Sequence, residues 1–330
     1  MLGLKGKSFL TLKDFTPGQI RLMLDTALQF KHNKQVGVPN KMHEGKTVAL
    51  VFEKTSTRTR CAFVVAARDL GIQAEYLGKD ETQLGKKESV RDTAAVLGRM
   101  FDGIEFRGYS HQTVEDLAKY SGVPVWNGLT DKYHPTQVLG DFLTIEEHIG
   151  HLKGVKLAYV GDGRNNVANS LIIGAALMGL DFRIATPLEL RPERSLLDEA
   201  AALIRKYRTG ARITITEDPI TAVKDADAIY TDVWVSMGEE DKFAERISLL
   251  RTYQVNRDLM AATGKAETLF LHCLPAFHDK NTVFGKQIYE QHGLESMEVT
   301  DEVFYSPNSV VFDEAENRVY TIEAVMALTL

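Results

Sequence analysis

The sequence predicts an α/β protein with two doubly wound parallel-sheet domains that are joined by a long helix. Three observations lead to this fold class: apolar runs alternate with helical patterns, the alternation breaks near Gly150, and 330 residues are many for a single core. The composition, with 44% hydrophobic and 25% charged residues, is typical of a globular protein. We therefore expect one domain over residues 1–149 and a second over 150–313.

The first half opens with a helix signal at Thr16-Pro17, where a capping residue precedes a proline at the first helical position. Short apolar runs then predict four strands, at residues 47–52, 72–77, 103–106 and 123–126. Helical patterns separate these runs, around residues 59–70, 89–100 and 111–120. A longer helical pattern from about His134 to His148 leads into the second half.

The second half repeats the alternation. Its apolar runs predict five strands, at residues 156–160, 182–185, 213–215, 228–230 and 268–271. The last segment, about 314–330, has a helical pattern, and we expect it to cross back and pack on the first domain. No repeat or low-complexity tract interrupts the pattern.

Charge and cysteine content exclude several classes of protein. The formal net charge is −6, and no basic block occurs, which argues against a nucleic-acid partner. Cys61 and Cys273 are too few for a disulfide framework, so we expect a reducing cytoplasm. Residues 1–10 contain no long apolar run, and we expect neither a signal peptide nor a membrane span there.

Residues 56–60, Ser-Thr-Arg-Thr-Arg, lie between an expected strand and an expected helix. The first N–H groups of a helix have no intrahelical partner, and the positive end of the helix dipole lies there, so the position suits an anion such as phosphate. An N-cap serine followed by two exposed arginines would give the same pattern. The other polar positions of the chain decide between these two interpretations.

Polar residues follow several of the expected strands or begin the helices. In open parallel sheets ligands bind beyond the carboxyl ends of the strands, so these positions are the candidates for chemistry. They are Ser56–Thr59, Arg107, His134, Gly161–Asn166, Asp232 and His272–Pro275.

Each candidate also has a structural interpretation. Arg107 could be solvated or could direct a planar fork of donors at an anion or a carbonyl oxygen. His134 could cap the long helix or, with Gln137 one turn later, hold a small amide or carbonyl group. Asp232 begins either a solvated loop or a loop whose carboxylate binds a substrate amine.

Two further motifs argue against a dinucleotide cofactor and against a zinc site. In Gly161–Asn166 the position of the third glycine of a dinucleotide loop is Asn166, which makes a nicotinamide or flavin site a weak interpretation. Cys273, next to His272, could be an inert buried thiol or part of a Cys–His pair. The spacing of Cys, His and Asp does not match a zinc site. We expect no metal and no cofactor.

Five blocks taken together resemble the ornithine carbamoyltransferases, and the resemblance runs from about residue 5 to the C-terminal end. The blocks are Ser-Thr-Arg-Thr (56–59), Phe-Arg-Gly (106–108), His-Pro-Thr-Gln (134–137), Asp-x-x-x-Ser-Met-Gly (232–238) and His-Cys-Leu-Pro (272–275). The first and third are shared with the wider carbamoyltransferase superfamily, whereas the last two indicate ornithine.

The resemblance implies a role for each matched residue. Arg107, His134 and Cys273 would be catalytic. Carbamoyl phosphate would be bound by Ser56, Thr57, Arg58, Thr59, Gln83, Arg107, His134, Gln137, Cys273, Leu274 and Arg318. Ornithine would be bound by Asn166, Asp232, Ser236 and Met237. Gln83 lies in a loop that, by the same resemblance, reaches the site of a neighbouring subunit, which implies a homo-oligomer, a trimer or a multiple of trimers.

The implied reaction transfers the carbamoyl group of carbamoyl phosphate to the δ-amine of L-ornithine and yields L-citrulline and phosphate. Asp232 and a thiol suit an amine and would repel the second carboxylate of aspartate. Putrescine or an acylated ornithine also presents an amine and stays an alternative. A nucleotide-dependent dehydrogenase and a non-catalytic phosphometabolite-binding protein are the competing classes, and the direction of the reaction is left open.

Overall fold

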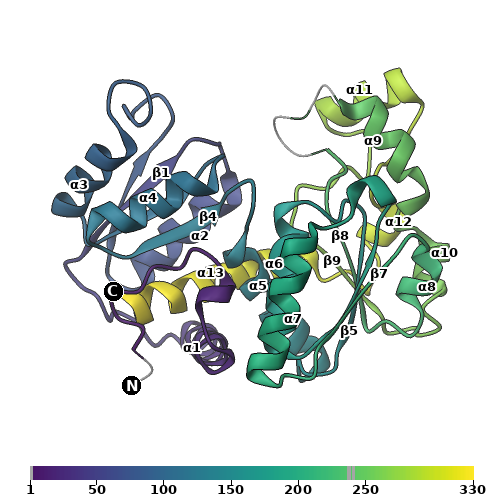
Figure 1. Ribbon diagram of the computed structural model, residues 1–330, viewed down its shortest axis with the longest axis horizontal. Helices are drawn as coiled ribbons and strands as arrows, with labels where there is room; N and C mark the ends of the chain where they lie inside the picture. The colour runs from purple at the N-terminus through teal and green to yellow at the C-terminus, as the bar shows by residue number, and fades with distance from the viewer. Residues whose placement is uncertain (1–2, 236–238, 240–241) are drawn as a thin grey trace. The chain divides into compact units, whose positions relative to one another are not determined.

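The computed structural model describes residues 3–235, 239 and 242–330, and these form two compact units (Figure 1). The first unit comprises residues 1–143 and 316–330, and the second comprises residues 144–315. Two helices pass from one unit into the other, α5 (Pro135–Ile149) and α13 (Val311–Thr329). The predicted fold class is confirmed, including the return of the C-terminal helix to the first unit.

The sheet of the first unit has the strand order β2–β1–β3–β4, with all neighbouring strands parallel. Its strands are β1 (Thr47–Phe52), β2 (Gln73–Leu77), β3 (Gly103–Arg107) and β4 (Val125–Leu129). The chain turns to opposite sides of β1 to build β2 and β3. The carboxyl ends of β1 and β3 therefore form a topological switch point, the usual place for a ligand in such sheets.

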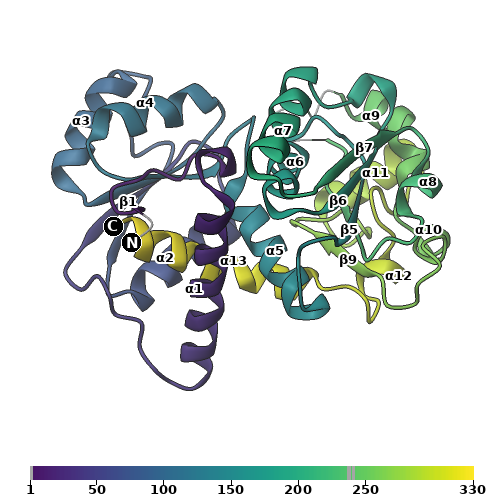
Figure 2. The same ribbon diagram turned by 60° about the horizontal axis from the view of Figure 1, so that its bottom comes forward.

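Helices cover both faces of this sheet. They are α1 (Pro17–Gln35), α2 (Thr57–Asp69), α3 (Val90–Met100) and α4 (His111–Ser121), and a short 3₁₀ turn, η1 (Leu12–Asp14), precedes α1. Alternate strand residues face opposite sides: Val125 joins the core under α3 and α4, whereas Trp126 contacts Phe63 of α2 and donates a hydrogen bond to Thr329 of α13. Helix α1 lies beside α13 (Figure 2), where Lys31 donates to Asn317 over 2.8 Å.

The sheet of the second unit has the strand order β7–β6–β5–β8–β9, again with all neighbours parallel. Its strands are β5 (Lys156–Val160), β6 (Asp181–Ala185), β7 (Arg212–Thr216), β8 (Ala228–Thr231) and β9 (Leu269–His272). The switch point lies between β5 and β8. The carboxyl ends of these two strands and of β9 carry the residues that follow them: Gly161, Asp232 and Cys273.

The helices of the second unit also lie on both faces of its sheet. They are α6 (Asn166–Met178), α7 (Arg194–Tyr207), α8 (Pro219–Val223), α9 (Phe243–Leu250), α10 (Arg257–Ala261), α11 (Val283–His292) and α12 (Asp301–Phe304), with 3₁₀ turns η2 (Leu188–Leu190) and η4 (Arg251–Tyr253). Ala158, Ile229 and Phe270 face a core that includes Leu250 of α9 and Leu259 of α10.

Local signals explain where most elements begin. Thr16 and Gln19 form the capping box of α1, so the helix predicted from Thr16-Pro17 is confirmed. The fourth strand differs from its predicted position, because it starts after Pro124 and continues through Asn127-Gly128. The Asn127 amide donates to the Leu10 carbonyl, which satisfies a polar side chain inside the strand.

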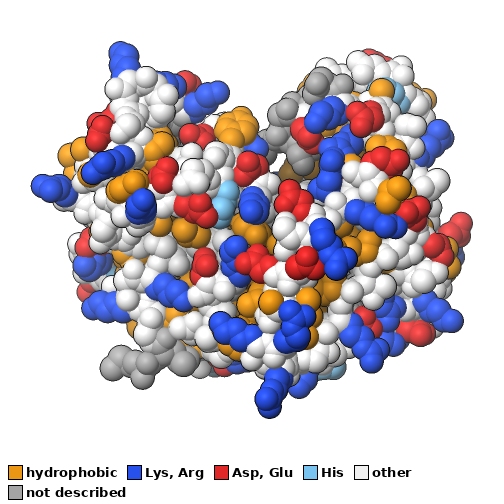
Figure 3. Space-filling model, viewed as in Figure 1, with side chains coloured by type: hydrophobic (Ala, Val, Ile, Leu, Met, Phe, Trp, Pro, Cys, Tyr) orange, Lys and Arg blue, Asp and Glu red, His pale blue; other side chains and the backbone are white. Residues whose placement is uncertain are grey.

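The outer surface carries charges of both signs. On the face drawn in Figure 3, lysine and arginine side chains are interspersed with aspartate and glutamate, and no extended basic patch covers this face. Among the helices of the described chain, none combines the length and the apolar character that a membrane span requires.

Candidate functional site

The start of α2 has the N-cap serine of the structural interpretation, and anion binding there stays a prediction. Ser56 is extended, with φ −160° and ψ 120°, and its hydroxyl accepts a hydrogen bond from the Thr59 N–H over 3.3 Å. Arg58 is half-buried, whereas Arg60 is exposed and stacks on Tyr76, with its guanidinium carbon 3.7 Å from the ring centroid. Two residues along a helix point about 200° apart. Only the first of the two predicted guanidinium groups therefore belongs to this site.

Thr59 is fully buried and accepts hydrogen bonds from two arginines. Arg107, the last residue of β3, donates from Nη1 over 3.2 Å, and Arg318 of α13 donates from Nη2 over 3.0 Å. Both arginines are almost completely buried, at 6% and 2% exposed. One hydroxyl thus fixes two guanidinium groups that come from distant parts of the sequence.

His134 lies directly before α5 and is 4% exposed. Burial lowers the pKa of His134 well below its usual value, and the positive charges of Arg318, Arg107 and Arg58 lower it further. The imidazole is therefore neutral at physiological pH. A neutral, fixed imidazole can donate a hydrogen bond to a carbonyl oxygen on which negative charge develops.

Gln137 lies on the first turn of α5 and is buried. Its backbone N–H donates to the His134 carbonyl over 3.2 Å, and its side-chain Nε2 donates to Asp141 over 2.9 Å. These bonds hold Gln137 beside His134, and the action of the pair on one small group stays a prediction.

Glu105 is a residue of this region that the sequence analysis missed. It lies inside β3 and is fully buried, and neither carboxyl oxygen has a hydrogen-bond partner among the described residues. Burial raises the pKa of Glu105 well above its usual value, although Arg107 and Arg318 act in the opposite direction. The raised pKa favours the protonated form of Glu105, in which its carboxyl group adds no negative charge beside Arg107 and Arg318. A glutamate within the apolar run Ile104-Glu105-Phe106 was the available signal.

Gln83 lies apart from these residues in a compact loop. Its carbonyl accepts backbone hydrogen bonds from Lys86, Lys87 and Glu88, at 3.0, 3.1 and 3.2 Å. The side chain is exposed and makes no hydrogen bond within the described part of the chain. Its predicted contact with a neighbouring subunit stays a prediction.

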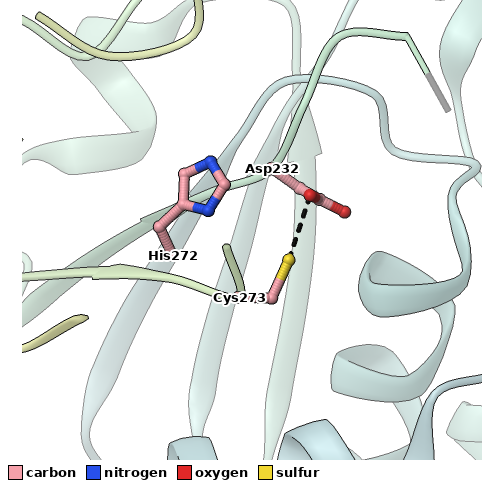
Figure 4. A group of neighbouring side chains, drawn as sticks. All are labelled: Asp232, His272 and Cys273. Atoms are coloured by element: carbon pink, nitrogen blue, oxygen red, sulfur yellow. Dashed lines mark hydrogen bonds between the residues drawn. The ribbon is translucent and has the colours of Figure 1, made fainter. Parts of the chain in front are cut away.

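In the second unit, Asp232 and Cys273 follow two adjacent strands. Thr231 of β8 pairs with His272 of β9, so the next residue of each strand leaves the sheet at the same level. The Cys273 thiol points toward the Asp232 carboxylate and donates to its Oδ1 over 3.0 Å (Figure 4). Asp232 is 7% exposed, and burial raises its pKa, although nearby His272 and the thiol hydrogen bond lower it.

Asn165 holds the other oxygen of Asp232. Its Nδ2 donates to Asp232 Oδ2 over 3.0 Å and to the Tyr159 hydroxyl over 2.7 Å, while its Oδ1 caps α6 through the Ala168 N–H. The predicted ligand Asn166 is the next residue and is half-buried at the start of α6. The sequence analysis included Asn165 in the candidate range Gly161–Asn166 but assigned a role only to Asn166, although an asparagine at an N-cap position was a usable signal.

His272 orients the turn after β9. Its Nδ1 accepts a hydrogen bond from the Leu274 N–H over 2.9 Å, so the ring proton lies on Nε2, which faces Glu298 Oε1 at 3.3 Å. Glu298 is fully buried and also accepts from the Phe277 N–H over 2.6 Å. These contacts hold Leu274 at φ +57°, a conformation that leucine rarely adopts. The direction of the preceding thiol is therefore fixed by the fold.

This geometry argues against two alternative uses of Cys273. Both ring nitrogens of His272 are engaged, with Leu274 and Glu298, so His272 does not activate the thiol as a nucleophile. The ligand atoms of Asp232, His272 and Cys273 lie within 4.8 Å of one another, a set that could hold a metal ion. A metal would first have to displace one of the hydrogen bonds of the His272 ring.

The structure thus gathers the predicted residues into two groups. The first unit brings together Thr59, Arg107, His134 and Arg318, with Arg58 acting on the same histidine, and the second brings Asp232 and Cys273 together beside Asn166. Ser236 and Met237 lie outside the described residues. Glu105, Tyr159 and Glu298 are additions that the sequence analysis did not predict, and Asn165 was in a candidate range without an assigned role.

Comparisons with known proteins agree with the chemistry of both groups. Residues 7–147 match the family described as "Aspartate/ornithine carbamoyltransferase, carbamoyl-P binding domain", and residues 153–329 match the corresponding "Asp/Orn binding domain". A Bacillus licheniformis protein named "Ornithine carbamoyltransferase, catabolic" is 61% identical over 329 residues, which are 100% of this chain and 98% of that protein.

Further relatives and a solved structure extend this similarity. A Staphylococcus aureus protein of the same name is 58% identical over 327 residues, which are 99% of this chain and 97% of that protein. The solved structure of ornithine carbamoyltransferase from Pyrococcus furiosus superposes with a TM-score of 0.90 at 46% identity, covering 99% of this chain and 97% of that one.

Proposed function

The chain belongs to the aspartate/ornithine carbamoyltransferase family, and we propose that it transfers the carbamoyl group of carbamoyl phosphate to the δ-amine of L-ornithine. The products are L-citrulline and phosphate. The observation that carries the choice of phosphorylated substrate is the cluster of buried arginines, in which Arg107 and Arg318 both donate to Thr59 and, with Arg58, lower the pKa of His134.

The residues of the first unit bind carbamoyl phosphate in this proposal. Ser56, Thr57, Arg58 and Thr59 hold the phosphate at the start of α2, where N–H groups and guanidinium donors favour an anion. Arg107 and His134 donate to the carbonyl oxygen, whose negative charge grows as the tetrahedral intermediate forms. Gln137 and the Leu274 backbone hold the carbamoyl amide. No covalent intermediate with the enzyme is needed, because positioning and electrostatic stabilisation lower the barrier.

The residues of the second unit bind the acceptor amine. An alkyl amine has a pKa of about 10.4 and must lose a proton before it attacks the carbamoyl carbon. Because burial raises the pKa of Asp232, this carboxylate is a better proton acceptor than an exposed aspartate. Cys273 orients the amine beside Asp232, and Asn166 with Ser236 and Met237 binds the amino-acid end of ornithine.

The charges of the second unit also bear on substrate choice. A buried carboxylate at Asp232 attracts an amine and repels the side-chain carboxylate of aspartate. Putrescine and acylated ornithine are not favoured, since the relatives at about 60% identity are named for ornithine.

Citrulline formation tests the proposal. Purified protein is supplied with carbamoyl phosphate and, in separate reactions, with L-ornithine, putrescine or L-aspartate. We expect citrulline from ornithine and at most traces of product from the other two acceptors. No citrulline from ornithine would overturn the proposed function.

The direction of the reaction and the assembly are further parts of the proposal. Relatives carry the word "catabolic" in their names, so we propose that the protein also runs from citrulline and phosphate to carbamoyl phosphate. Kinetics in both directions, with arsenate replacing phosphate to draw off the product, measure this preference.

We further propose a homotrimer in which the Gln83 loop completes a neighbouring site. Light scattering measures the mass of the assembly. Mixing Q83A and R58A variants, each inactive alone, is expected to restore part of the activity if the sites are shared. The cytoplasmic location predicted from the cysteine content stays an expectation, supported by Cys61 and Cys273, neither of which forms a disulfide.

A further inference from the structure

Arg246 in α9 is a buried arginine that none of the assigned roles uses. It is 2% exposed, and its guanidinium group contacts two carboxylates. Nη1 lies 3.2 Å from Asp162 Oδ2, and Nη2 donates to Glu239 Oε2 over 3.1 Å. One side chain thus connects three separate segments of the second unit.

The two partner carboxylates lie in segments next to the proposed ornithine ligands. Asp162 belongs to the loop between β5 and α6, which ends at Asn165 and Asn166. Glu239 follows the predicted Ser-Met-Gly block in the sequence and also accepts a hydrogen bond from Lys242 over 2.8 Å.

Contacts continue from Asp162 to the reacting groups. Asp162 Oδ1 accepts a hydrogen bond from the Arg164 N–H over 2.9 Å, which tightens the short turn before Asn165. Asn165 then donates to Asp232 over 3.0 Å, and Cys273 donates to the other oxygen of Asp232. A shift of the Asp162 turn would therefore move the asparagine that orients Asp232.

Stability alone is a poor explanation for this arrangement. Removing an arginine and a carboxylate from water costs several kcal/mol, and a buried ion pair often fails to recover that cost. Within the described residues, Nε and Nη1 of Arg246 have no hydrogen-bond partner, and Nη1 contacts Asp162 as an ion pair only, so the burial of this guanidinium group is not fully compensated. An apolar side chain of similar volume would suit a purely structural position better.

We propose that Arg246 is a positioning residue for ornithine: by bridging Asp162 and Glu239 it fixes the turn that places Asn165, Asn166 and Asp232. The inference rests on the proposed function, because it assigns ornithine to these residues. Arg246 touches neither substrate in this scheme and acts through the two carboxylates.

The test compares R246M with the wild type in steady-state kinetics. We expect the KM for ornithine to rise by about tenfold or more, because an unanchored turn must be ordered when ornithine binds. The KM for carbamoyl phosphate is expected to stay within about twofold of wild type, since its proposed ligands Ser56–Thr59 and Arg107 do not contact Arg246. R246K, which keeps the charge but not the fork of donors, is expected to give an intermediate KM.

A matched control removes another arginine of the same unit. Arg183 in β6 pairs with Asp181 over 3.0 Å and donates to the Ala222 carbonyl, and it contacts neither the Asp162 turn nor Glu239. R183M is expected to lower the melting temperature but to keep the wild-type KM for ornithine. An unchanged KM in R246M, or an equal rise in R183M, would overturn the inference.

Two more variants keep the test decisive if R246M does not fold. D162N and E239Q each weaken one of the two contacts, and each is expected to raise the KM for ornithine but not the KM for carbamoyl phosphate. Wild-type KM values in both would overturn the inference. A wild-type protein that makes no citrulline would instead contradict the proposed function, so the two failures are distinguishable.

Discussion

At the carboxyl ends of its strands, the first unit gathers the guanidinium groups of arginines, whereas the second unit places a carboxylate and a thiol there. Both groups lie at the same kind of place, the switch point of a parallel sheet. Burial has a different consequence in each. In the first unit it lowers the pKa of His134 and raises the pKa of Glu105, which favours the neutral form of both side chains. In the second unit it raises the pKa of Asp232, which makes this carboxylate a stronger proton acceptor.

The two units thus share the place where a ligand binds, which the fold determines, and differ in the charge at that place, which depends on the residues around the strand ends. A phosphate needs positive groups without an ionised acid nearby, and an amine needs an acid that accepts a proton. Variants that remove the charge of one group and leave the other group intact test this comparison.

The largest effect is expected from R107M. Without its guanidinium group, the developing oxyanion loses a charged donor, and kcat is expected to fall by about 10²- to 10³-fold. Arg318 still donates to Thr59, so the variant is expected to fold. Steady-state kinetics and a thermal melt measure both quantities, and a kcat within tenfold of wild type would contradict the role of Arg107.

Replacing Asp232 with asparagine tests the second unit. D232N keeps the shape but removes the proton acceptor, and we expect kcat to fall by about 10²-fold. The KM for carbamoyl phosphate is expected to stay within about twofold, because that substrate is assigned to other residues. Asp225, on an exposed turn of the same unit, is the matched control, and D225N is expected to behave like the wild type. A D232N variant with full kcat would refute the assignment.

R58M and R60M form a matched pair within one helix. Loss of Arg58 removes a charge-assisted contact worth about 1.5–3 kcal/mol, so the KM for carbamoyl phosphate is expected to rise by roughly 10- to 100-fold. Loss of Arg60 removes only its stacking on Tyr76, about 0.5–1 kcal/mol of stability, and the KM is expected to stay unchanged. Equal effects of the two variants on the KM would mean that both arginines bind phosphate.

The smallest effect concerns Glu323, a buried carboxyl of the first unit that lies outside the site. Burial raises the pKa of Glu323 to about 7, and the charge of Asp69 adds to the shift, while a hydrogen bond from Asn40 and the charge of Lys34 oppose it. Because the folded state favours the protonated form, the stability from this group is present below the unfolded pKa and is lost as the pH rises from about 4.5 to about 7.

We therefore expect E323Q to be more stable than the wild type by about 1–2 kcal/mol at pH 8 and nearly equal to it at pH 4. The Asn40 hydrogen bond is kept, since glutamine still offers an oxygen. Urea unfolding at both pH values gives the difference. The control variant E44Q changes an exposed glutamate, and the pH dependence of its unfolding free energy is expected to match that of the wild type. The prediction fails if the unfolding free energy of E323Q has the same pH dependence as the wild type.

The sequence predicted the fold class and much of the candidate site for definite physical reasons. The period and length of the apolar runs predicted all nine strands of the two sheets, the fourth with shifted bounds. Ligands bind beyond the carboxyl ends of parallel strands, and this rule singled out Arg107, Asp232 and Cys273, because each lies at a strand end or directly after it. Arg318 came from the resemblance alone, since it lies in a helix far from any strand end.

Other parts of the site depend on tertiary contacts. Glu298 lies in no strand and reaches His272 only through the fold. Arg246 resembles any other helical arginine in the sequence, and its burial becomes visible only when Asp162 and Glu239 are placed around it. Glu105 carried a local signal, but the rise of its pKa follows from complete burial, which a run of three residues does not reveal.

The discontinuous first unit has a consequence for synthesis of the protein. Thr59 needs Arg318 as one of its two donors, and Trp126 needs Thr329, so the ends of the unit are separated by the whole second unit in the chain. During translation residues 144–315 leave the ribosome before residues 316–330, so the first unit is the last to be completed. In a growing chain, Thr59 therefore has both of its arginine donors only after Arg318 has emerged.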